Sequence, residues 1–224
     1  MKFVALKTFK QNNHSITAMK NRIIFATILA ATLWNCTDHD PVTSSTYKLD
    51  DKSVAEWRGY LKTGYFNEGT INVESENLVI KDGKVFSGSF TIPMSSIVNI
   101  NLPTEELKHQ LVHHLQSPDF FDMALHPNAT FNIADIKPYS GSNADDVPGA
   151  NYLVNGTLNI LGKSNPISFP AKIDVAGSLL HAEGNVKFDR TKFGITFASD
   201  PALPAENYIE PLISIHLKLS GHKK

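Results

Sequence analysis

The side chains best suited to chemistry lie in one short stretch near the middle of the sequence. The stretch holds His109, His113, His114, Asp119, Asp122 and His126. His109 and His113 are spaced like two metal ligands on one helix face, but a zinc-peptidase helix would carry glutamate where this one has Gln110. The sequence therefore predicts a solvated helix face and no metal site.

His114 differs from its neighbours because it falls on the apolar stripe of the same helix. We expect it to make a buried hydrogen bond that fixes the helix to the rest of the fold. Asp119 and Asp122 flank Phe120-Phe121, and this spacing fits capping and an apolar plug better than acid–base catalysis. The sequence also lacks a Gly-x-Ser-x-Gly motif, a phosphate loop and a dinucleotide fingerprint, so we expect no enzyme and no cofactor.

Arg190 is the charged residue of most interest in the second half. It follows an apolar strand and precedes Phe193-Gly194, which places it at a strand end. Its planar donors could pair with Asp119 or Asp122, or could meet a lipid head group. We expect the structural pairing and keep the second role open, so His114, Asp119 and Arg190 are candidate rim residues.

A helix must position the histidines. Thr104 is suited to be its N-cap, and Glu105 and Glu106 place negative charge in its first turn. The apolar stripe consists of Leu107, Leu111, His114 and Leu115. A second short turn is predicted at Ser117-Pro118, because proline fits the first helical position.

Most of the remaining sequence alternates between apolar and polar residues. About eight such segments, with Asp82-Gly83 as one clear turn, predict a mainly all-β antiparallel sheet, closed as an up-and-down barrel or packed as a sandwich. A barrel of this size holds side chains or one slender ligand. The residues predicted to line its interior are Trp57, Phe86, Gly88, Phe90, Ile92, Phe131, Gly156, Ile160, Phe169, Ile173 and Phe188.

Three glycines on the predicted inward faces bear on the contents of the barrel. Gly88, Gly156 and Gly184 would leave space for a tunnel in a curved barrel. The alternative is that they permit bends in a fully packed core. Both interpretations remain open from the sequence.

The first 36 residues have the character of a leader and a signal peptide. Met19 begins a short cationic segment and is a candidate start site, and Ile23 to Trp34 form an apolar run of signal-peptide length. Cys36, the only cysteine, ends this run in a sequence that resembles a bacterial lipobox. We expect lipid attachment at Cys36, and the alternative is a plain signal peptide cut elsewhere.

The rest of the chain divides into two parts. Residues 37–46 are polar and are predicted to be a tether, and residues 47–224 form the barrel domain. The net charge is −1, and the basic residues are spread along the chain, which disfavours nucleic acid as a partner.

The segments read together resemble the YceI-like family of bacterial periplasmic proteins. The resemblance is carried by His114-Leu115, Ser117, Asp119-Phe120-Phe121-Asp122, Pro127 and Thr130-Phe131, by the segment 156–167, and by the segment 189–195. It implies a lipocalin-like barrel, a helical segment closing one end, and a long apolar tunnel for an isoprenoid or fatty tail.

These observations predict an exported lipid-binding protein of the periplasm or cell envelope, anchored to a membrane through Cys36. Its partner would be a long-chain apolar lipid held in the barrel. The alternative is a non-enzymatic envelope scaffold or stress-related protein whose barrel is packed solid. The oligomeric state is left open, a dimer included.

Overall fold

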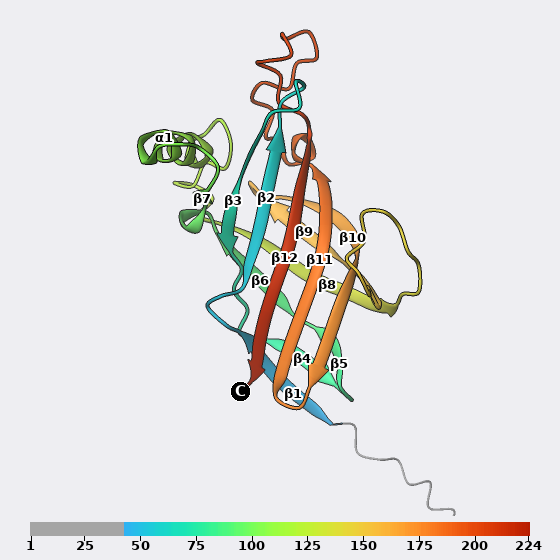
Figure 1. Ribbon diagram of the computed structural model, residues 1–224. Coiled ribbons are helices and arrows are strands. Elements are labelled where there is room, and N and C mark those ends of the chain that lie inside the picture. The colour runs from blue at the N-terminus through green and yellow to red at the C-terminus, as the bar shows by residue number, and fades with distance from the viewer. Residues whose placement is uncertain (1–42) are drawn as a thin grey trace, which may run out of the picture. The chain divides into compact units, whose positions relative to one another are not determined.

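Residues 43–224 are described by a computed structural model, in which strands predominate (Figure 1). The strands are β1 Ser44–Leu49, β2 Val54–Tyr60, β3 Phe66–Asn72, β4 Leu78–Lys81, β5 Lys84–Ser87, β6 Ser89–Pro93, β7 Val98–Asn99, β8 Asn128–Pro138, β9 Tyr152–Ile160, β10 Lys163–Ala176, β11 Leu179–Asp189 and β12 Leu212–Lys223. The helices are α1 Glu105–Gln116 and the 3-10 helices η1 Met94–Ser96 and η2 Arg190–Phe193. Within residues 43–224 no helix has the length and apolar character needed to span a bilayer.

The strands form an antiparallel barrel with eight positions around its wall. Strands β8 to β12 each fill one position, and pairs of shorter strands share the other three: β1 with β2, β3 with β4, and β5 with β6. The wall closes through an isolated bridge between Glu74 and Thr91 and a hydrogen bond from Ile133 N to Gly88 O of 3.0 Å. The predicted antiparallel barrel is confirmed, with twelve strands because three positions are divided and β7 adds to the edge of β3.

Strand β1 begins earlier than the sequence suggested. Residues 44–46, at the end of the expected tether, pair with residues 79–81 of β4 and belong to the sheet. The tether prediction is therefore wrong for these three residues, because strand pairing recruits even a polar run when a partner edge is available. The leader, Cys36 and most of the tether lie outside the described residues.

Phe86 was predicted to face inward and does not, since 56% of its surface is exposed. In β5 it is Val85 that reaches the interior, whereas in β6 it is Phe90. The alternation shifts by one residue at Gly88, between the two strands, and β4 carries an irregular register opposite β5. The outward ring of Phe86 instead lies beneath the Lys81 ammonium group, 3.5 Å from the ring centroid.

Gly88 and Gly156 do not leave space for a tunnel. A Cβ at Gly88 would collide with the Leu78 side chain. A Cβ at Gly156 would collide with the Phe131 ring and lie 2.5 Å from the carbonyl oxygen of Asn132. Both glycines therefore allow close packing of neighbouring groups, which corrects their assignment to the lining and favours the packed interpretation at these two positions.

Helix α1 begins as predicted. The Thr104 hydroxyl accepts a hydrogen bond of 3.2 Å from the backbone N–H of Leu107. The helix lies at one end of the barrel beside β7 (Figure 1). Leu111 and Leu115 reach the barrel interior, while Leu107 is 41% exposed, so only the later part of the predicted stripe faces the fold.

Candidate functional site

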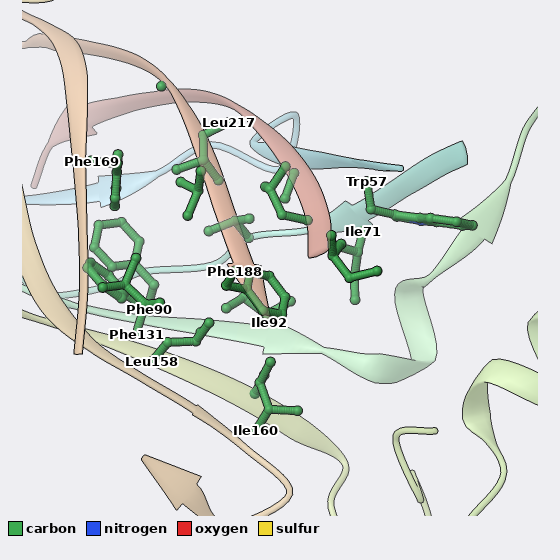
Figure 2. Close-up of a pocket in the computed structure, with 18 of the residues that line it drawn as sticks. Trp57, Ile71, Phe90, Ile92, Phe131, Leu158, Ile160, Phe169, Phe188 and Leu217 are labelled. Atoms are coloured by element: carbon green, nitrogen blue, oxygen red, sulfur yellow. The ribbon is translucent and has the colours of Figure 1, made fainter. Parts of the chain in front are cut away.

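The interior of the barrel contains an apolar cavity of about 300 Å³. Figure 2 shows aromatic and aliphatic side chains that converge on it from several strands. The labelled lining residues are Trp57, Ile71, Phe90, Ile92, Phe131, Leu158, Ile160, Phe169, Phe188 and Leu217. The volume lies at the lower end of the range typical of ligand cavities.

The cavity follows the strands. Along β12 the successive inward residues Ile213, Ile215, Leu217 and Leu219 all line it. At about 3.4 Å per residue, these positions cover roughly 20 Å of strand. Such a long and narrow apolar space suits an extended hydrocarbon chain better than a compact ligand.

The structure brings most of the predicted lining residues together. Those on the cavity wall are Trp57, Phe90, Ile92, Phe131, Ile160, Phe169, Ile173 and Phe188. Of the three glycines, Gly184 also borders the cavity, and a Cβ there would lie 3.2 Å from the Phe169 ring. Asn67 on β3 is a lining residue that sequence reasoning missed, because an isolated asparagine in a strand gives no pattern to recognise.

The short turn after α1 supplies the expected apolar plug. Phe120 is buried, and both Phe120 and Phe121 line the cavity. His114 Nε2 lies 3.0 Å from Asp119 Oδ2, and its ring packs edge-on against Phe120 and Phe197 at centroid distances of 5.0 and 4.9 Å. The expected buried bond from helix to barrel is wrong, since the partner lies in the same segment and the His114 side chain is 39% exposed.

Arg190 does not pair with Asp119 or Asp122, which corrects the sequence-based expectation. The side chain is 2% exposed, and its hydrogen bonds all run to backbone carbonyl groups. They join Nε to Glu210 O at 3.2 Å, Nη1 to Ile195 O at 2.8 Å and Nη2 to Ile209 O at 2.8 Å. Arg190 therefore fastens the segment 195–210 to the barrel and is not an exposed rim residue.

The charge of Arg190 is balanced only by its neighbour in the chain. Burial lowers the pKa of Arg190, and the negative charge of Asp189 acts in the opposite direction. Hydrogen bonds from Thr191 to the Asp189 carboxylate lower the pKa of Asp189, so this carboxylate stays ionised beside the guanidinium. Three of the five N–H groups of Arg190 therefore donate to backbone carbonyl groups, and its first role is structural.

The two histidines with metal-ligand spacing lie on the solvent-exposed face of α1. His109 and His113 are both exposed. Among residues 43–224, no three His, Cys, Asp or Glu side chains come close enough together to hold a metal ion.

Comparison with known proteins identifies the family to which the sequence belongs. The sequence matches the model of the YceI-like domain over residues 40–220. The chain belongs to the YceI-like family. The resemblance seen in the sequence is thereby confirmed.

YceI-like relatives are distant in sequence. A UPF0312 protein from Pectobacterium carotovorum is 28% identical over 132 residues, which cover 52% of this chain and 63% of the relative. A UPF0312 protein from Azotobacter vinelandii is 27% identical over 143 residues, covering 58% of this chain and 69% of that protein.

Two solved structures share the YceI-like barrel. Burkholderia cenocepacia BcnA superposes with a TM-score of 0.57 at 19% identity, covering 77% of this chain and 98% of BcnA. A polyisoprenoid binding domain from Saccharophagus degradans superposes with a TM-score of 0.58 at 11% identity, covering 80% of this chain and 99% of that domain. At these identities the likeness establishes the fold alone.

Proposed function

We propose that this YceI-like protein binds one long apolar chain, polyisoprenoid-like or fatty-acid-like, inside its barrel. The observation that carries the proposal is the cavity that follows the strands. Among the lining residues, all within the described range, only Glu183 and Arg190 are charged. Arg190 is engaged by backbone carbonyls, and the Glu183 carboxylate lies 3.1 Å from His216 Nε2 on an exposed side. The remaining wall favours hydrocarbon.

The relatives support the same ligand class. The Saccharophagus degradans domain is described as polyisoprenoid binding, and it shares the barrel fold with this chain. The wall of the cavity offers hydrocarbon contacts rather than paired acid and base groups, so we propose binding and not catalysis. The alternative of a solidly packed scaffold is less favoured, because a packed core leaves few voids larger than a water molecule.

Removing bound lipid is expected to lower the melting temperature. A ligand bound only by the folded state stabilises it by about 2.7 kcal/mol at a hundredfold excess over Kd, which corresponds to about 5–10 °C for a domain of this size. The measurement compares thermal melts of natively purified, delipidated and reconstituted protein, with mass spectrometry of the extract. An extract without lipid, together with melts that a C20 or longer isoprenoid does not shift, would favour the packed scaffold instead.

We also propose export to the cell envelope and attachment through Cys36, which lies outside the described residues. The support is the apolar run that ends at this cysteine. Substituting Cys36→Ser is expected to move the protein from the membrane fraction to the soluble fraction. The polar residues that follow Cys36 cannot anchor the protein in a bilayer without the lipid. Fractionation and immunoblotting measure this shift, and unchanged membrane partition of the variant contradicts the anchor.

A further inference from the structure

Two buried polar atoms interrupt the apolar wall of the cavity. Trp57 Nε1, a donor, and Asn67 Oδ1, an acceptor, are buried and have no hydrogen-bond partner among residues 43–224. Both residues line the cavity. A buried polar atom without a partner costs about 1–3 kcal/mol, so two of them on one wall call for a physical explanation.

The two residues are neighbours on the inner face of β2 and β3. Trp57 pairs with Gly69, and Asn67 pairs with Gly59, two residues further along the same strand pair. Residues in this diagonal relation lie about 7–8 Å apart at their backbones, with side chains on the same face. A single hydroxyl oxygen can accept from one atom and donate to another when the two lie about 5 Å apart, which is the separation that a shared hydroxyl requires here.

Glycine stands opposite each polar residue. The indole of Trp57 lies against Gly69, since a Cβ built at Gly69 would be 2.9 Å from Trp57 Cζ2. Beside Asn67, a Cβ built at Gly59 would be 3.5 Å from Ile213 Cδ1. The nearest group on that side is therefore the flexible end of a side chain rather than backbone, and such a group can shift when a ligand enters.

We propose that this polar pair is a subsite for the hydroxyl end of a long-chain alcohol, a refinement that rests on the proposed function. The hydroxyl accepts from Trp57 Nε1 and donates to Asn67 Oδ1, while the hydrocarbon tail follows the apolar cavity. A charged end group is disfavoured here, because three of the five N–H groups of Arg190 already donate to backbone carbonyl groups and no other lining residue of the described range is cationic.

Three C20 isoprenoid probes test the subsite: the alcohol, its methyl ether and the hydrocarbon without an end group. Dissociation constants are measured on the full chain by competition against a fluorescent polyene lipid. The ether keeps the acceptor for Trp57 but cannot donate to Asn67. We expect the alcohol to bind about tenfold more tightly than the ether, and the hydrocarbon to bind no better than the ether.

Substitutions separate the polar contacts from general packing. Trp57→Phe and Asn67→Leu are expected to reduce the advantage of the alcohol over the hydrocarbon to less than about threefold. The control Ile92→Val, which trims an apolar lining residue, should weaken alcohol and hydrocarbon alike. Thermal melts establish that each variant is folded.

The outcomes distinguish the subsite from the proposed function. Equal binding of alcohol and hydrocarbon by the parent overturns the subsite and leaves lipid binding standing. The subsite is also overturned, with lipid binding still standing, if both polar variants keep the preference for the alcohol. The same holds if the parent binds the ionised C20 acid more tightly than the alcohol. Failure of all these probes to bind the folded parent overturns the subsite and the proposed function together.

Discussion

Substituting Gly59→Leu is expected to abolish uptake of a long isoprenoid while leaving the barrel folded. Gly59 lines the cavity with an ordinary strand conformation, and its added Cβ would meet only Ile213 Cδ1, at 3.5 Å. The rest of the leucine side chain must then occupy space that the ligand needs. We expect at least a tenfold loss of affinity, measured by lipid titration, with little change in the melting temperature of delipidated protein.

Two variants serve as controls for this result. Phe86→Leu changes an exposed aromatic residue away from the cavity and should leave uptake unchanged. Gly156→Ala should instead destabilise the fold, because its Cβ would press on the Asn132 carbonyl and the Phe131 ring. Normal uptake by a folded Gly59→Leu protein would show that the ligand lies elsewhere.

Removing the guanidinium of Arg190 is expected to have the largest effect on stability. Arg190→Met keeps an apolar stem of similar length but leaves the carbonyl groups of Ile195, Ile209 and Glu210 without their donor. Because these groups lie at a buried side chain, we expect the free energy of unfolding to fall by about 3–5 kcal/mol. Urea unfolding followed by circular dichroism measures the loss.

The matched control for Arg190→Met is Arg58→Met on the outer surface. Arg58 pairs with Glu68, and 44% of its side chain is exposed, so the free energy of unfolding should fall by less than about 1 kcal/mol. Equal losses in the two variants would contradict the role assigned to the backbone contacts of Arg190.

The parts of the fold that depend on local periodicity could be predicted from the sequence. Alternation in β9 to β11 places Ile160, Phe169, Ile173 and Phe188 on the cavity wall, because strand side chains change face at every residue. The N-cap at Thr104 could also be predicted, because its hydrogen bond from the Leu107 N–H joins residues only three positions apart in the sequence.

The failures have a common physical origin in contacts between distant segments. Phe86 faces outward because the alternation shifts by one residue at Gly88, and this shift accompanies the irregular pairing of β5 with β4. Charge pairing suggested a carboxylate for Arg190, whereas its partners are backbone oxygens of a segment that follows later in the chain. Asn67 gains its interest only because Trp57 lies diagonally across β2 and β3.

The way β12 is shared has a consequence for the time course of folding. Tyr47 in β1 pairs with Lys223 in β12, and residues 54–58 of β2 pair with residues 214–218, so each early strand finds one of its two partners only at the far end of the chain. Such non-local pairing must overcome a large loop-closure entropy, which slows the folding of barrels. A nascent chain that still lacks its last strand can pair β1 with β4 and β2 with β3, but it has no strand that joins these pairs to β11. The wall cannot close during synthesis, and until the final strand arrives the apolar faces remain exposed to aggregation or to a chaperone.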